Sequence, residues 1–162
     1  MNRRRNYNKA LVCIIMGFIV LGAAVGSLSA QENKTQKALK IHGQGIELWR
    51  QGNFTDAADK FRKAIKIDDT NASIYYDLGK LLMDELKDTD NAIDAFTLSA
   101  SYEINHWRAY YNIGKAYAKK EDCKKAIEFY LKAMDSLEKL GQLTENYKTV
   151  LLKRLKDCNY EE

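Results

Sequence analysis

One feature restricts the fold more than any other: the middle of the chain repeats itself every 34 or 35 residues. Glycines recur at Gly45, Gly79 and Gly114. Alanines recur at positions 57, 92 and 126, each followed by an aromatic residue four positions later and a small residue seven positions later. Four columns that agree across three segments indicate three copies of one structural unit, which we place at residues 38–71, 72–106 and 107–140.

Each copy has the pattern of a helical hairpin. In the third, apolar residues recur at helical spacing over 110–117 and again over 126–133, with polar residues between them. Pro, the main breaker of helix interiors, is absent from the sequence. A single hairpin cannot bury its apolar stripe, so the three are expected to stack. The second copy has one extra residue, which we expect in the hairpin turn at Lys87–Asp90.

The repeats resemble the tetratricopeptide repeat. AYYNIGKAY (109–117) is similar to the family's first-helix signature, and KAIEFYLKAM (125–134) is similar to its second-helix signature. GNFTDAADKFRKAIKIDD (52–69) matches the turn and second helix of another copy. The resemblance covers roughly residues 38–140 and implies an all-α solenoid that binds other proteins without catalysis. Asp69 and Ile104 stand where the family usually has Pro, so the inter-repeat turns are expected to be helical extensions.

The first thirty residues have the order of a secretory signal peptide. Residues 1–9 are basic, 11–25 are almost entirely apolar, and small residues lead to Ala30, where cleavage is expected. The alternative is an uncleaved membrane anchor, because residues 10–28 carry no charge and are just long enough to span a bilayer. Both readings predict an exported protein, periplasmic or secreted, that touches a membrane only through this segment. Residues 31–37 are then a polar linker.

Residues 141–162 are expected to form a capping helix and a short tail. Gly141 offers a helix stop, and Thr144 can cap a new start. A terminal helix that is apolar on one side closes the end of a solenoid. The apolar side of this helix consists of Leu143, Tyr147, Leu151, Leu155 and Cys158.

Two cysteines are placed to meet. Cys123 begins the last helix of the third hairpin, Cys158 lies near the end of the capping helix, and the turn at Leu140–Gly141 is midway between them. Two antiparallel helices joined at that turn bring both residues opposite each other. A disulfide is predicted if the compartment is oxidising, and two unpaired buried cysteines are the alternative.

Charge and composition exclude several functions. The chain has 26 Lys and Arg against 22 Asp and Glu, and the whole excess lies in the first thirty residues. A neutral remainder gives no reason to expect nucleic-acid binding. The two histidines, His42 and His106, lie in different copies, and no Cys/His spacing matches a zinc site. We therefore expect no enzyme, no metal and no cofactor.

The resemblance implies where a partner binds, because in the family the first helices of successive repeats line a concave groove for a peptide or protein segment. By position, this groove contains His42, Ile46, Trp49, Tyr76, Lys80, Met83, Arg108, Tyr111 and Lys115. Aromatic and basic residues suit a segment with acidic and apolar side chains. Chaperone-binding members hold a carboxylate at positions that match His42, Ile46, Asp77, Arg108 and Asn112. Only Arg108 keeps the charge, so that activity is not expected.

Two functions remain. The protein is either an extracytoplasmic adaptor that binds a partner segment, or a structural subunit packed permanently into an envelope or membrane-associated assembly. A subunit of the second kind exposes a large apolar patch when it is alone.

Overall fold

The computed structural model describes residues 31–103 and 106–159 and divides the chain into two units, Met1–Lys37 and Ala38–Glu162. The predicted signal or anchor segment, residues 1–30, lies outside the described residues. Within the described part, no helix is long and apolar enough to cross a membrane. Residues 31–37, predicted as a linker, are themselves helical.

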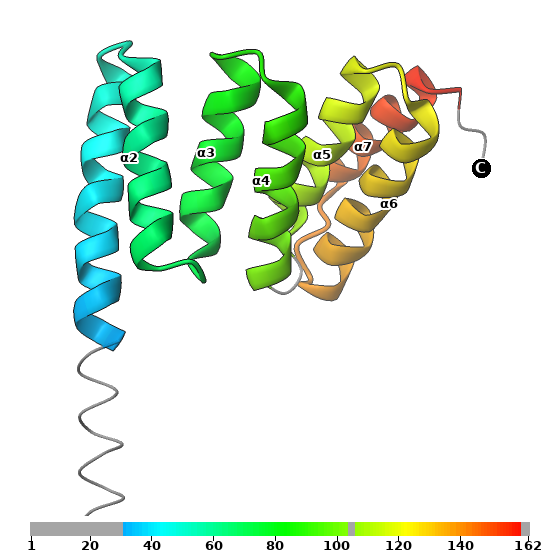
Figure 1. The fold of residues 1–162 in the computed structure, drawn as a ribbon. Helices are drawn as coiled ribbons and strands as arrows, with labels where there is room; N and C mark the ends of the chain where they lie inside the picture. Colours follow the sequence, from blue (N-terminus) through cyan, green and yellow to red (C-terminus); the bar gives the residue numbers. More distant parts are fainter. Residues whose placement is uncertain (1–30, 104–105, 160–162) are drawn as a thin grey trace, which may run out of the picture. The chain divides into compact units, whose positions relative to one another are not determined.

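Every element among the described residues is a helix, and the helices form antiparallel pairs in chain order (Figure 1). In the second unit, the helix that ends at residue 50 pairs with the next helix to form the first hairpin. Two further hairpins and one terminal helix follow, with each helix packed on the next. Their bounds are α2 Phe54–Ile67, α3 Ala72–Asp84, α4 Thr89–Tyr102, α5 Trp107–Lys119, α6 Cys123–Lys139 and α7 Glu145–Asp157.

In each hairpin, the recurring glycine of the first helix packs against the recurring aromatic ring of the second helix. A Cβ atom at Gly114 would lie 2.7 Å from two ring atoms of Tyr130, and one at Gly79 would lie 2.8 Å from the ring of Phe96. Gly45 faces Phe61 in the same way, at 2.6 Å. Because carbon atoms in contact lie about 3.5–4.0 Å apart, only glycine lets the ring seat against the helix backbone. The glycine column therefore permits the two helices of each hairpin to pack closely.

The hairpin turns explain the extra residue of the second copy. In the first and third hairpins, the amide of the last turn residue bonds back five positions, from 53 to 48 and from 122 to 117. In the second, the amide of Asp88 bonds back six positions to Leu82. The insertion therefore lies in the turn 85–88, at or before its left-handed residue Lys87. The insertion is slightly earlier than the predicted stretch Lys87–Asp90, because residues 89 and 90 of that stretch already belong to α4.

The turn between the first two hairpins is not a helical extension. The helix ends at Ile67, and the carboxylate of Asp68 accepts hydrogen bonds from the amide and the hydroxyl of Thr70. Asn71 then caps α3 by accepting from the amide of Ser73. Local polar side chains thus end one helix and start the next without the proline that the family usually has there.

One buried polar contact joins the second hairpin to the third. The hydroxyl of Ser99, which is 0% exposed, donates to the backbone oxygen of Ala72 at 2.8 Å and lies 3.1 Å from Nδ1 of His106. Ser99 occupies the small-residue column, where the other two copies have alanine. The serine connects the starts of α3 and α5 across the end of α4.

The C-terminal helix packs as the sequence predicts. Gly141 has a left-handed backbone (φ 64°) and ends α6, and the hydroxyl of Thr144 caps α7 by accepting from the amide of Tyr147. Leu151, Leu155 and Cys158 are buried against α6, and the other two predicted apolar residues are half-buried. The end of the solenoid is therefore closed by a helix with one apolar side.

Candidate functional site

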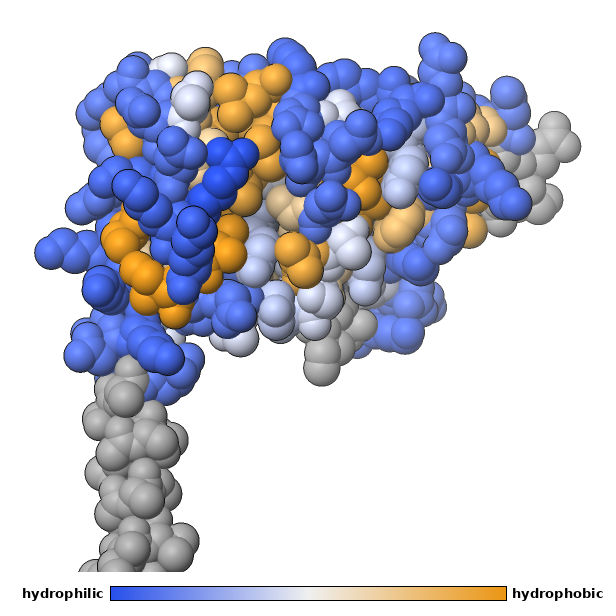
Figure 2. Space-filling model, viewed as in Figure 1, coloured by the Kyte–Doolittle hydropathy of each residue, from blue (hydrophilic) through white to orange (hydrophobic). Residues whose placement is uncertain are grey.

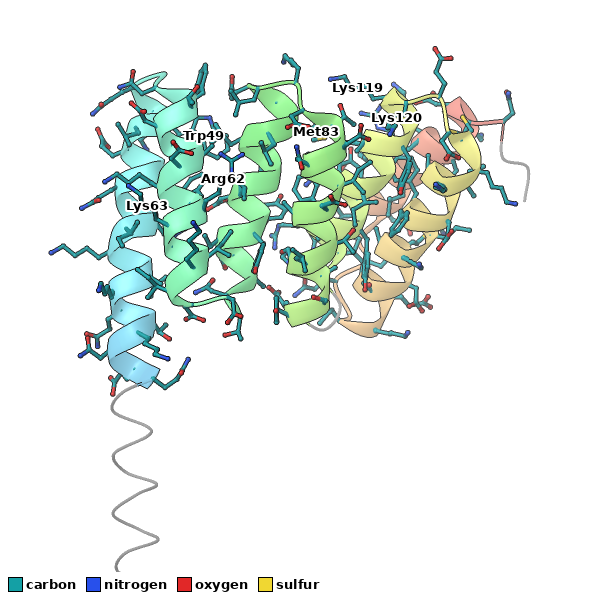
Figure 3. All side chains as sticks on the ribbon, in the orientation of Figure 1. Trp49, Arg62, Lys63, Met83, Lys119 and Lys120 are labelled. Carbon is teal, nitrogen blue, oxygen red and sulfur yellow. The ribbon has the colours of Figure 1, made fainter. Side chains whose placement is uncertain are left out.

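The nine predicted groove residues lie on the first helices of the three hairpins. His42, Ile46 and Trp49 belong to the helix that ends at residue 50, the next three belong to α3, and the last three belong to α5. Figure 3 shows Trp49 on the first helix, Met83 towards the end of α3 and Lys119 at the end of α5.

A cavity of about 320 Å³ lies between α3 and α5. Five of the nine predicted residues line it: Tyr76, Lys80, Arg108, Tyr111 and Lys115. Three residues not in the predicted set complete its wall, namely Asp84, Trp107 and Asn112. This cavity brings residues of the second and third repeats together around one hollow.

A second cavity, of about 330 Å³, adjoins the first at the C-terminal ends of the same two helices. The two share Asp84 and Lys115. The remaining lining residues of the second are Met83, Lys87, Ala118, Lys119, Tyr130 and Arg154. Met83 is 5% exposed, so it forms part of the floor rather than of the rim.

A third cavity, of about 220 Å³, adjoins the first on its other side and lies between α5 and α7. It shares Trp107 and Tyr111 with the first. No lining residue is charged, and the others are Leu137, Asn146, Tyr147, Val150 and Leu151. The aromatic rings of Trp107 and Tyr147 lie 4.9 Å apart between centroids. We refer to these three adjoining cavities as the inner groove.

The predicted residues of the first repeat do not line these three cavities. Nε2 of His42 lies 2.8 Å from a carboxylate oxygen of Asp77, and the ring also packs on Phe61. The indole Nε1 of Trp49 donates to a carboxylate oxygen of Glu85 at 3.4 Å, and Lys80 lies 5.8 Å from the centre of its ring. These side chains hold the first hairpin to the second.

The positions that match the chaperone carboxylate clamp are also engaged within the protein. Asp77 faces His42, and the half-buried Ile46 packs against the core. The side-chain amide of Asn112, which is 7% exposed, donates to the backbone oxygen of Arg108 and to the hydroxyl of Tyr76. Among these positions, Arg108 alone has an exposed cationic side chain.

Positive charge dominates the inner groove. Its lining includes six basic side chains and one acidic one, Asp84. Within the described part of the chain, five of the six form no ion pair with a carboxylate: Lys80, Lys87, Arg108, Lys115 and Lys119. On α6, by contrast, Lys125, Lys132 and Lys139 each pair with an acid within one turn of helix. The groove therefore carries positive charge that the protein itself does not neutralise.

The sixth base, Arg154, links the capping helix to α5. It hydrogen-bonds to the hydroxyl of Tyr111, which raises the pKa of the guanidinium, and it also pairs with Asp157 at 3.7 Å. Burial raises the pKa of Tyr130 to about 12, so its phenol is neutral in the groove wall. Burial likewise raises the pKa of Tyr76. The groove thus presents neutral phenols and cations, which suit an anionic ligand.

Sequence reasoning missed the contribution of α7. Tyr147, Val150 and Arg154 reach the inner groove, although the helix was interpreted only as a cap. The helical register did indicate that Arg154 borders the packed side of α7, because it lies three residues after the buried Leu151 and four residues before the buried Cys158. The pattern could not show that this border faces α5.

The two cysteines meet as expected. Sγ of Cys123 lies 2.7 Å from Sγ of Cys158, and both are thiols here. A disulfide bond is about 2.05 Å long, so the two sulfur atoms lie close to bonding distance. Burial, followed by the hydrogen bond with Cys123, raises the pKa of Cys158 to about 11. In the described residues, no group of three or more His, Cys, Asp or Glu side chains could hold a metal ion.

Comparisons with known proteins agree with this architecture. A TPR repeat family model matches residues 45–84, and a tetratricopeptide repeat model matches 72–103 and 108–139. No curated protein sequence matches the chain.

Several solved structures share the fold. The Yersinia enterocolitica type III secretion chaperone SycD, in complex with a peptide of the translocator YopD, is 15% identical with a TM-score of 0.64, covering 74% of this chain and 90% of the other. The first TPR of Spaghetti (RPAP3), bound to the HSP90 peptide SRMEEVD, is 19% identical with a TM-score of 0.66, covering 78% and 96%. The N-terminal domain of stress-induced protein-1 from C. elegans is 18% identical with a TM-score of 0.67, covering 78% and 98%. With the family models covering more than half of the sequence, the chain belongs to the tetratricopeptide repeat family.

Proposed function

We propose that the protein is a non-catalytic, extracytoplasmic adaptor that binds an extended segment of another protein in the inner groove. One observation carries the proposal: three adjoining cavities are lined by aromatic side chains and by cations without ion-pair partners. Aromatic residues and arginine contribute most to interface energies, and unneutralised charge attracts a complementary partner.

The related folds support a peptide ligand. SycD is complexed with a translocator peptide, and Spaghetti is bound to an HSP90 peptide. Identities of 15–19% support the fold and not the partner. Because Asp77 and Asn112 are engaged with other side chains, a terminal carboxylate clamped as in chaperone-binding members is not the ligand we propose. The family's domains typically bind rather than catalyse, which supports a non-enzymatic role.

Export is proposed from the sequence of residues 1–30, either with cleavage near Ala30 or with an uncleaved anchor. In an oxidising compartment, we propose that Cys123 and Cys158 form a disulfide, because their sulfur atoms are already 2.7 Å apart. Closing this span adds about 3–4 kcal/mol of stability in the chain-entropy model. Peptide mapping of exported protein without reductant tests the bond, and two alkylatable thiols would contradict it.

In-cell photo-crosslinking tests the adaptor function. A photoreactive amino acid replaces Tyr111 in the inner groove, and the control carries it at Glu128, an exposed position of α6 outside the three cavities. A discrete crosslinked band at Tyr111 alone is expected, and mass spectrometry then identifies the partner. If Tyr111 gives no band, the groove does not bind a partner segment.

The same experiment addresses the structural-subunit alternative, for which bands at both positions are expected. The adaptor is favoured because the exposed large apolar residues are distributed over different elements. They are Leu39, Leu86, Leu98, Tyr102, Leu140 and Val150. On the face shown in Figure 2, hydrophobic side chains are visible over the first helix and α2 and at several places further along the solenoid, with hydrophilic side chains between them.

A further inference from the structure

The third cavity differs from the rest of the inner groove. It is lined by three aromatic rings, three aliphatic side chains and the neutral amide of Asn146, whereas the first and second cavities contain all six cations. The capping helix α7 provides most of its wall, and the three hairpins without that helix would not form it. The groove therefore has two chemically distinct parts in a fixed order.

We propose that the cavity between α5 and α7 holds one aromatic or leucine side chain of the partner segment, and that acidic residues of the same segment lie over the neighbouring cations. This inference rests on the proposed function and specifies its ligand. A partner segment of this kind satisfies both parts of the groove at once, which a purely acidic or purely apolar segment cannot.

The volume of the cavity fits one large side chain. At about 220 Å³, it exceeds the roughly 150 Å³ that suffices to hold benzene in an apolar protein cavity. The walls offer ring faces and edges from Trp107, Tyr111 and Tyr147, which favour an aromatic guest packed at an angle. Val150, which is 40% exposed, lies in the wall without being part of the packed core.

The charge of the neighbouring cavities selects the rest of the segment. Lys80, Arg108 and Lys115 line the adjoining cavity without ion pairs, and Asp84 is its only acid. Glutamate or aspartate in the partner would neutralise charge that the chain leaves uncompensated. A basic segment, including the chain's own residues 1–9, would be repelled.

Helix geometry sets the spacing between the two features. Trp107 lines the apolar cavity, and Lys115 lies just over two turns further along α5, which is roughly 12 Å along the axis. An extended chain advances about 3.3 Å per residue, so the acidic residues are expected roughly three or four positions from the apolar one.

Selection from a display library of random linear peptides tests this, with the reduced full-length protein as bait. Enriched peptides are expected to carry Trp, Phe or Leu with Asp or Glu three or four positions away. A fluorescein-labelled peptide of the enriched sequence then serves as the probe in polarisation titrations. Enrichment of basic-apolar or purely acidic peptides would overturn the inference while leaving peptide binding intact.

Matched variants locate the bound peptide. V150R places a charge in the apolar cavity, and L98R makes the same kind of change at a residue of α4 with similar exposure, 42% against 40%, outside the inner groove. V150R is expected to weaken probe binding about tenfold to hundredfold, the equivalent of losing one buried apolar side chain. L98R is expected to leave the affinity unchanged.

The proposed contact between acidic residues of the partner and the cations of the groove is tested by Lys115→Glu, with Lys124→Glu on α6 as the control. K115E is expected to weaken binding about tenfold at low salt and less at high salt, because the charges are partly screened. If K115E weakens the probe and V150R does not, the apolar subsite is refuted and the proposed function stands. If no peptide is enriched, or if both controls weaken binding as much as the groove variants, the proposed function itself fails.

Discussion

The close approach of helices at the glycine column can be measured by replacing Gly114 with alanine. The new Cβ would lie 2.7 Å from the ring of Tyr130 and 3.2 Å from its Cγ atom, which is fixed near the backbone. Tyr130 is 1% exposed and packs within the core formed by α6 and α7. Forcing a methyl group into such a site costs about 1–3 kcal/mol. Alanine regains about 1 kcal/mol of helix propensity, so G114A is expected to lose about 0–2 kcal/mol.

Gly43 supplies the matched control. It is also a helical glycine, but an added Cβ would meet nothing within 4 Å. G43A should therefore gain about 1 kcal/mol from propensity alone. Because both variants share that gain, the difference between them isolates the steric cost, expected at about 1–3 kcal/mol. Urea unfolding followed by circular dichroism gives both free energies of unfolding.

A third variant checks the cause. Tyr130→Leu is expected to lower stability by itself, because it leaves a cavity. In that background, however, the additional cost of G114A should disappear, since no ring remains to collide with the methyl group. The reasoning is refuted if G114A stabilises the protein as much as G43A does, or if its cost is the same with and without Tyr130.

Three further predictions concern stability and reactivity. Glu121 has a left-handed backbone (φ 62°) in the turn where the first hairpin has a glycine, so E121G should raise the free energy of unfolding by about 0.5–1 kcal/mol in urea. S99A should lower the free energy of unfolding by about 1–3 kcal/mol, because the backbone oxygen of Ala72 and Nδ1 of His106 lose their hydrogen-bonding partner. S136A should change the free energy of unfolding little, because the hydroxyl of Ser136 bonds only within its own helix. Because the thiolate is the form that reacts and the pKa of Cys158 is about 11, iodoacetamide should alkylate this residue about a hundredfold more slowly than an unperturbed thiol in reduced protein at pH 8. The alkylation rate, measured by mass spectrometry, should rise until about pH 11. Because the folded state favours the neutral thiol, that residue's contribution to stability is complete below about pH 9 and is lost as the pH rises towards 11. A Cys158 that reacts as fast as an exposed thiol would contradict the burial on which this rests.

The local pattern of the sequence determined the helices and the way each hairpin closes. Glycine, alanine and aromatic columns recur because the same contact is made three times within a short stretch of chain, and each contact involves residues only 16 or 17 positions apart. Gly141 and Thr144 act within one turn of helix, and so their roles could be identified from the sequence alone. The meeting of Cys123 and Cys158 followed from the same symmetry about one turn.

Only the tertiary structure decided which side chains line a common hollow and which neutralise one another. His42 and Trp49 fit the groove by position, but contacts with Asp77 and Glu85 of the next repeat engage them. Arg154 and Tyr147 were assigned to a cap, although the crossing of α7 over α5 brings them into the inner groove. Helix periodicity specifies the face on which a residue lies, whereas the angle between helices decides what that face meets, and that angle depends on packing between residues far apart in the sequence.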